Sequence, residues 1–343
     1  MKRTILVFGV VTLLPVPLFV IGSFSGQAWL LAAFGYMTLL CYLLDVLLWL
    51  PRKNADKKPD ISGADALSMV LAGFHFPLLY LGVLTIAGTT GLEYWERAVA
   101  FFAFGLYFGQ VSNSNAHELI HRGNKLLHEL GKWVLISLLF GHHTSAHLYV
   151  HHRFACSDRD PNSARKGETF YQFARRAWIE SFNEGLKAED RRLVAQNQLL
   201  HPYVIYIGGS LLLLSISLVI AGWWGVATHI GLAAYATMQL LMADYVQHYG
   251  LRRRSGQEGK LEPFGPHHAW NSKHRFSGWL MLNAPKHSGH HMQPTVPYPA
   301  QTVPPNALLL PRSLPIMSIV ALFPRRWRRV MDPLVDQAAE GLA

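Results

Sequence analysis

The chain has 343 residues, of which half are hydrophobic and 15% are charged, whereas about a quarter are charged in an ordinary soluble domain. The apolar residues gather into nearly charge-free blocks of about 20 residues, the length that a helix needs to cross a bilayer. This pattern excludes an ordinary soluble protein and predicts an all-α membrane protein that crosses the bilayer several times. Two further features of the composition have to be placed along the chain: the 18 histidines and the excess of basic residues that gives a formal charge of +10.

We expect six transmembrane helices, at residues 4–23, 28–50, 66–88, 94–112, 204–222 and 224–242. The first follows Lys2 and Arg3 as a signal peptide would, but it lacks a convincing cleavage site and a second span follows at once. Residues 133–140 are too short to span and suit a buried or interfacial segment. No internal repeat divides the chain, so residues 1–343 are expected to form one membrane-embedded domain.

Basic residues divide the loops into two kinds. The loops at 21–27, 89–91 and 221–222 have no Lys or Arg. The positive charges lie instead before the first span and after the second, fourth and sixth, at Lys2, Arg3, Arg52, Lys53, Lys57, Lys58, Arg122, Lys125, Arg252, Arg253 and Arg254. Because positively charged loops stay in the cytoplasm, both termini are expected on the cytoplasmic side of the membrane. Segments 113–203 and 243–343 would form a helical cap there, and most of the charge reflects topology rather than a nucleic-acid partner.

Nine histidines of this cap occur in motifs. Two of them flank Glu118 in an HExxH string, where i and i+4 positions share one helix face and can chelate a metal. Three more form HxxxHH, three form HxxHH, and one follows the sixth span. The nine are His117, His121, His147, His151, His152, His248, His287, His290 and His291. Nine imidazoles exceed what one metal ion takes and imply two ions with four or five ligands each. Imidazole alone does not choose between iron, copper and zinc.

Two other classes of protein share parts of this pattern. An HExxH string by itself is typical of a zinc protease in which Glu118 acts as the general base, but the further motif histidines argue against that function. A metal transporter should place its ligands near the bilayer midplane, whereas these clusters lie on one face of the membrane.

The motif order resembles the integral-membrane fatty-acid desaturase and hydroxylase superfamily and, within it, the bacterial alkane monooxygenases. The resemblance runs from about the second span to residue 333, and residues 115–122, 147–165, 244–251 and 268–274 carry it. The chain departs from the family at Gln247 and Ala146, where Glu is usual, and at Pro285 and Lys286, where Gln-Arg is usual. These departures leave room for a divergent substrate.

The resemblance implies a non-haem diiron monooxygenase that uses O2 and two electrons to convert a terminal C–H of an alkane or similar hydrocarbon into a primary alcohol. The nine histidines would ligate the two irons, with their division between the ions left open. Cys41 and Cys156 form no CxxC pair and exclude a built-in iron–sulfur or rubredoxin module. Electrons would therefore come from an external carrier. The resemblance implies that this carrier is of the rubredoxin type, with an NAD(P)H-dependent reductase, and that the enzyme lies in a bacterial inner membrane. The same scaffold fits a hydroxylase of aromatic methyl groups or terpenes, or a fatty-acyl desaturase.

Several polar residues are candidates for supporting roles. Glu118 either accepts a hydrogen bond from a ligand imidazole or is a solvated helix residue, and Asp45 either bonds a ligand histidine or pairs with a basic residue at the interface. Asp160 is expected to anchor its loop through arginine or backbone contacts. Interfacial or supporting positions are expected for His142, His143, His267, His268 and His274. His75 and His229, inside spans, should be hydrogen-bonded packing residues.

A basic strip near the C-terminus has two interpretations. It consists of Arg325, Arg326, Trp327, Arg328 and Arg329. It either anchors the chain at lipid headgroups, with Trp327 at the interface, or helps to dock an acidic electron carrier by charge complementarity.

Overall fold

The computed structural model describes residues 3–48, 61–197, 199–256 and 259–340. Within these ranges the secondary structure is helical, with two isolated β-bridges, Ser255–Leu261 and Asn271–Leu309, and no strand. The predicted all-α class is therefore confirmed. Residues 1–2 and 49–60 lie outside the described ranges, and with them Lys2 and the basic run after the second predicted span.

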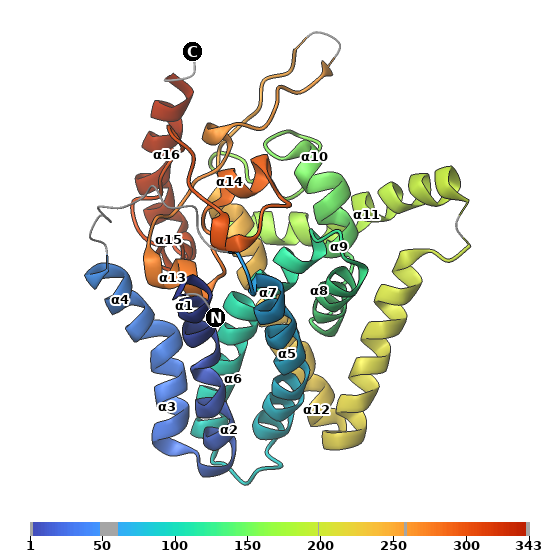
Figure 1. Cartoon of the computed structure of the whole chain (residues 1–343), viewed down its shortest axis with the longest axis vertical. Helices are drawn as coiled ribbons and strands as arrows, with labels where there is room; N and C mark the ends of the chain where they lie inside the picture. The colour runs from blue at the N-terminus through green and yellow to red at the C-terminus, as the bar shows by residue number, and fades with distance from the viewer. Residues whose placement is uncertain (1–2, 49–60, 198, 257–258, 341–343) are drawn as a thin grey trace.

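Four of the described helical segments are long and apolar enough to cross a membrane. They are Thr4–Ser25, made of α1 (Arg3–Leu13) and α2 (Pro15–Ser25); Gln27–Leu47, made of α3 (Gln27–Gly35), the π-helical turn η1 (Tyr36–Leu40) and α4 (Cys41–Leu47); α5 (Ala64–Ala87); and α12 (Pro202–His248). Figure 1 shows α2, α3, α5 and the lower part of α12 at one end of the molecule. They coincide with the predicted spans one, two and three and with the region of spans five and six.

The long helix α12 is broken in the middle. Its 47 residues would measure about 70 Å as one rod, more than twice the thickness of a hydrocarbon core. Ala221 and Gly222 have non-helical backbone angles, and Gly222 has φ 61°, a region that glycine enters without steric cost. The break falls where the sequence placed the boundary between the fifth and sixth spans.

The predicted fourth span is helical but more polar than the others. It comprises α6 (Tyr94–Tyr107) and the π-helical turn η2 (Phe108–Ser112), and α7 (Asn113–Ile120) continues it. It contains Glu96 and Arg97, and it is not among the four long apolar segments. Nevertheless α6 packs against α3, α5 and α12. A total of six spans stays a prediction.

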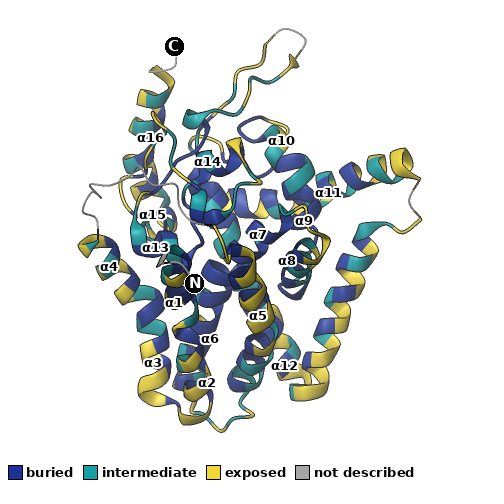
Figure 2. Cartoon of the chain, in the orientation of Figure 1, coloured by how far each residue is buried: buried dark blue, intermediate teal, exposed yellow. Residues whose placement is uncertain are grey.

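The outer faces of these helices expose large apolar side chains. Leu47 is 67% exposed, Val219 84% and Trp223 77%. Figure 2 shows exposed residues along α3 and around the bend of α12. Extended exposed apolar surface marks contact with another apolar phase, and in helices of this length that phase is the bilayer. The chain is therefore a membrane protein.

Shorter helices cover one end of this bundle. They are α8 (Lys125–Ser137), α9 (His143–Ala146), the π-helical turn η3 (His147–His151), α10 (His152–Phe154), α11 (Phe170–Gln196), the 3-10 turn η5 (Pro266–His268), α13 (Arg275–Leu280), α14 (His287–Met292), the 3-10 turn η6 (Tyr298–Ala300), α15 (Leu314–Ala321) and α16 (Pro324–Glu340). Figure 1 shows α9, α10, α14 and α16 above the apolar helices. Residues 134–136 are fully buried, which agrees with the buried segment expected at 133–140.

The C-terminal helix α16 packs into an apolar cluster that it shares with α11, α12 and α15. Trp327 is fully buried, and its ring centroid lies 5.3 Å from that of Tyr245 and 5.2 Å from that of Tyr249. The expectation that Trp327 lies at a membrane interface is therefore wrong, because the side chain fills the contact between α16 and the end of α12. The four neighbouring arginines, at 325, 326, 328 and 329, are exposed.

Candidate metal centre

The nine motif histidines come together in two groups. The five-histidine group consists of His117, His121, His147, His152 and His290, and the four-histidine group consists of His151, His248, His287 and His291. In each group, every residue has one ring nitrogen within 4.8 Å of those of all the others. The structure thus divides a set of ligand candidates that the sequence left undivided.

Local helix geometry explains how the HxxxHH cluster contributes to both groups. His147 and His152 are five residues apart, and in an α-helix they would point in different directions. The π-helical turn η3 has about one more residue per turn, and the Nε2 atoms of His147 and His152 lie 2.9 Å apart. His151, next to His152, turns toward the other group, where its Nε2 lies 3.1 Å from that of His291.

The HxxHH cluster on α14 divides in the same way. His287 and His291 are one helical turn apart, with 3.1 Å between their Nε2 atoms. His290 faces the five-histidine group and places its Nε2 3.2 Å from that of His152. Successive helical side chains point about 100° apart, so adjacent histidines serve different groups. His248, at the end of α12, completes the four-histidine group with its Nε2 2.9 Å from that of His287.

These distances fit metal coordination. Two imidazole nitrogens that each lie about 2.0–2.1 Å from one ion, at right angles, are about 3 Å apart. The Nε2 atom of His147 lies 3.0 Å from that of His121 and 2.9 Å from that of His152, and one N–H cannot serve both. Burial lowers the pKa of His117 to about 3, which keeps the imidazole neutral, as a metal ligand must be. The donor set fits two ions.

A buried carboxylate orients one of these histidines. His151 donates from Nδ1 to Asp160 Oδ2 over 2.9 Å, which leaves Nε2 to face the four-histidine group. Asp160 also accepts from the Ser163 hydroxyl at 2.6 Å and from the Asn162 N–H at 3.1 Å. The backbone contact that the sequence predicted for Asp160 is present, but the sequence did not predict its hydrogen bond with His151. The available signal was a carboxylate nine residues after a ligand candidate in a short polar loop.

The two predicted supporting carboxylates bond elsewhere. Glu118 accepts from Arg122 at 2.6 Å and from the Tyr298 N–H at 2.9 Å, so it joins α7 to η6. Asp45 accepts from the Ser277 N–H at 2.9 Å and thereby joins α4 to α13. Among the described residues, no hydrogen bond connects either carboxylate with the nine histidines.

The histidines that were expected at interfacial or supporting positions differ in how closely they approach the two groups. The ring of His143 lies 4.9 Å from that of His147, and the backbone carbonyl of His268 lies 3.3 Å from His248 Nδ1. His142 contacts Ser181 and His274 contacts Ser272. His267 and His268 also form a small cluster with Glu262.

The two intramembrane histidines are hydrogen-bonded, as expected. His75 bonds the hydroxyls of Ser112 and Ser137 at 2.9 and 2.7 Å. His229 bonds the Ser217 hydroxyl at 2.8 Å and the Ser137 carbonyl at 2.7 Å.

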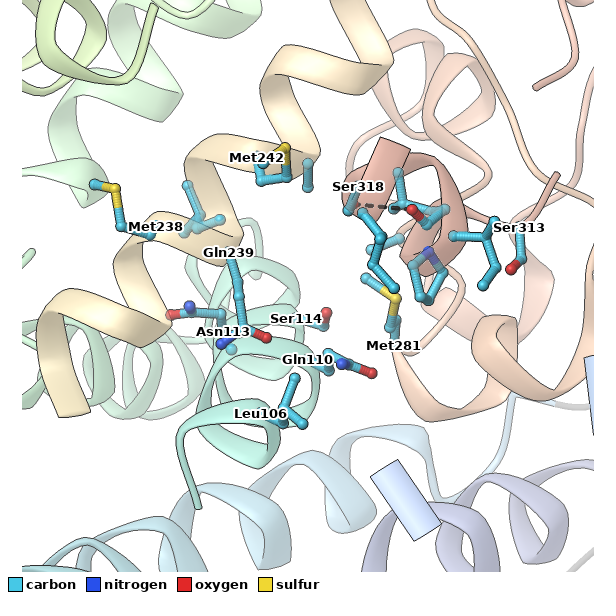
Figure 3. A pocket seen from close by; sticks show the side chains of 18 of the residues that line it. Leu106, Gln110, Asn113, Ser114, Met238, Gln239, Met242, Met281, Ser313 and Ser318 are labelled. Carbon is cyan, nitrogen blue, oxygen red and sulfur yellow. Dashed lines mark hydrogen bonds between the residues drawn. The ribbon is translucent and has the colours of Figure 1, made fainter. Parts of the chain in front are cut away.

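A largely apolar cavity of ≈ 440 Å³ reaches both groups. Its lining includes His117 from the five-histidine group and His287 from the four-histidine group. The other walls come from α4, α6, η2, α12 and α15, and Figure 3 shows Met238, Met242 and Met281 around it. A ligand in this cavity can therefore lie beside both candidate metal positions.

Apolar membrane helices beneath nine clustered histidines define an integral membrane protein with a site suited to two metal ions. The family model described as fatty acid desaturase matches residues 93–301. The chain therefore belongs to the fatty acid desaturase family. Two alkane 1-monooxygenases, each 30% identical to it over most of its length, place it within their branch of that family.

Individual relatives show how far the likeness extends. The alkane 1-monooxygenase of Ectopseudomonas oleovorans is 30% identical over 79% of this chain and 69% of its own length. Alkane 1-monooxygenase 1 of Pseudomonas aeruginosa is 30% identical over 85% of this chain and 79% of its own. The hydroxylase component of the xylene/toluene monooxygenase of Pseudomonas putida is 28% identical over 52% of this chain and 48% of its own.

Proposed function

We propose that the protein is a membrane-bound diiron monooxygenase that hydroxylates a terminal C–H of an alkane or similar hydrocarbon to a primary alcohol. One oxygen atom of O2 enters the new C–OH group and the other leaves as water, which consumes two protons and two electrons from an external carrier. The observation that carries the proposal is the apolar cavity that touches one histidine of each group. The alkane 1-monooxygenases among the relatives support the substrate class.

The nine histidines are proposed to hold two irons, five at one and four at the other. Iron supplies the redox chemistry with O2 that an alkane C–H requires, because this bond has no acidic proton and no leaving group, and zinc has no redox chemistry. Asp160 holds His151 in the tautomer that presents Nε2. The methionines and leucines of the cavity wall exclude water and position the hydrocarbon.

The electrons are proposed to come from a rubredoxin-type carrier and its NAD(P)H-dependent reductase on the cytoplasmic side of the inner membrane. Both cysteines are buried and unpaired, and the chain has no cysteine motif for an iron–sulfur centre of its own. The four exposed arginines of α16 are a candidate docking surface for an acidic carrier. Their reversal to glutamate should raise the apparent KM for the carrier, and an unchanged KM would favour the headgroup role.

Reconstitution tests the proposal. The purified full chain, loaded with iron, is mixed with rubredoxin, its reductase, NADH and a panel of alkanes, methylarenes and terpenes. We expect two irons per chain and an alcohol that forms only with substrate, O2 and carrier together. Oxidation of methylarenes alone would favour the alternative that the xylene/toluene relative suggests, and oxidation of terpenes alone would favour a terpene hydroxylase. If no hydrocarbon yields an alcohol, the proposal is wrong.

A further inference from the structure

We infer that the preferred substrate of this site carries a hydroxyl group at the end away from the oxidised carbon, and that Gln110 in the cavity wall recognises it. The inference rests on the proposed hydroxylase function and narrows its substrate class from plain hydrocarbons to long apolar alcohols. It starts from the hydrogen bonds of the amide side chains that line the cavity.

Gln110 differs from the other cavity amides. Asn113 donates to the Ala236 carbonyl at 2.8 Å, Gln239 to the Gly105 carbonyl at 2.8 Å, and Gln247 to the Ala284 carbonyl at 3.1 Å. Gln110 is only 8% exposed, and its buried Oε1 has no hydrogen-bond partner among the described residues. A buried amide oxygen without a hydrogen bond is energetically unfavourable, so this oxygen needs a partner that the described residues do not supply.

The cavity itself is where that partner can lie. Gln110 is part of η2, and Ser114 follows it in α7; both line the cavity. Figure 3 shows the Gln110 amide directed away from its helix toward the space beside Met281, with the Ser114 side chain above it. The rest of this region is apolar, with Leu106, Met238 and Met281 in the wall. A matching ligand is therefore mostly hydrocarbon with one polar group.

The hydrogen-bonding capacity of the Gln110 amide indicates that the polar group of the ligand is a hydroxyl. The unpaired oxygen needs a donor, which an alcohol supplies and a ketone, an ether or an alkane does not. A hydroxyl also accepts, so it can satisfy either orientation of the carboxamide. Ser114 can add a second contact to the same group.

The position of Gln110 predicts where on the substrate the hydroxyl lies. Gln110 precedes His117 by seven residues, about two helical turns or roughly 10 Å. A hydroxyl held at Gln110 thus leaves the other end of a long alcohol near the histidines. There one oxygen atom of O2 converts a C–H bond into C–OH. The other oxygen atom leaves as water after taking up two electrons from the carrier and two protons from solvent, and the recognised hydroxyl is unchanged. The product is a diol.

Competition between matched substrates tests the inference on the iron-loaded full-length enzyme. A long-chain primary alcohol, its methyl ether and the alkane of equal length are compared in wild type and in Gln110→Met, which keeps the side-chain volume similar. We expect the wild type to prefer the alcohol, and the ratio of kcat/KM for alcohol over ether to fall about tenfold in Gln110→Met, the effect of one lost hydrogen bond. Ser114→Ala should lower the ratio less.

Leu106→Met, one turn earlier in the same wall, is the matched control and should change the ratio less than twofold. Binding gives a readout without turnover: the alcohol should raise the melting temperature of detergent-solubilised wild type more than the ether does, and this difference should vanish in Gln110→Met. Equal preference for alcohol and ether in the wild type, or an unchanged ratio in Gln110→Met, would mean that the amide holds only water and would overturn the inference. A wild type that oxidises none of the compounds would instead contradict the proposed hydroxylase function.

Discussion

Asp160 shows what a single carboxylate does beside a cluster of ligands. It is fully enclosed, and its Oδ2 accepts from both His151 and Ser163. Burial by itself raises the pKa of Asp160, but His151 and the Ser163 hydrogen bond outweigh it and hold the pKa below its usual value. The carboxylate therefore stays charged and fixes the imidazole of His151.

Replacing this carboxylate tests its role at the metal site. Asp160→Asn should lower metal affinity or activity by about 10–100-fold, the usual effect of losing a partner of a ligand histidine. Metal content after dialysis and the hydroxylation rate measure the change. Asp158→Asn is the control, because Asp158 is 87% exposed and faces Arg252; equal losses in both variants would contradict the assignment.

The neighbouring residues His290 and His291 should have separable effects. His290 belongs to the five-histidine group and His291 to the four-histidine group. Each Ala variant should lose metal mainly from its own group and retain about one ion per chain, with different spectra for the two remaining irons. His201→Asn, outside both groups, should keep two. Identical spectra for His290→Ala and His291→Ala would show that the two groups do not act as separate sites.

At the scale of elements, π-helical turns recur where the site is built. η1 and η2 contribute residues to the cavity, and η3 carries His147 and His151. The extra residue in each turn shifts the register of the side chains that follow. Such turns carry no strong local sequence signal, which is why the sequence predicted uninterrupted spans at η1 and η2.

The short helix α14 packs tightly against the following loop. A Cβ atom on Gly289 would lie 2.2 Å from the Thr302 carbonyl oxygen, a backbone atom that cannot turn aside. Gly289→Ala should therefore displace α14 and with it His290 and His291, lowering both the melting temperature and the iron content.

A glycine in open space gives the control for this prediction. A Cβ on Gly208 in α12 would meet no atom within 4 Å, and Gly→Ala in a helix stabilises by about 0.5–1 kcal/mol. Gly208→Ala should keep or raise the melting temperature. If Gly289→Ala behaves in the same way, the close packing of α14 is not required.

For the whole molecule, the predicted orientation in the membrane can be tested by labelling. The loop that contains Thr89 is expected outside the cytoplasm, and the histidine-bearing end, with Asp158, inside it. Both native cysteines are buried, so a thiol reagent should react only with a cysteine that is introduced at the surface. A membrane-impermeant thiol reagent added to intact cells or spheroplasts should label Thr89→Cys and leave Asp158→Cys unlabelled until the membrane is opened. The reverse pattern would invert the proposed topology.

The sequence by itself determined the helical class, the apolar segments and the nine clustered histidines, because these depend on composition and on spacing along the chain. Only the tertiary structure decided the division into groups of five and four, since His151 and His152, adjacent in sequence, point to different groups. It also revealed the hydrogen bond between Asp160 and His151 and the amide oxygen of Gln110 that has no partner among the described residues. These features depend on where helix register and packing direct each side chain, and residue spacing alone does not specify that direction.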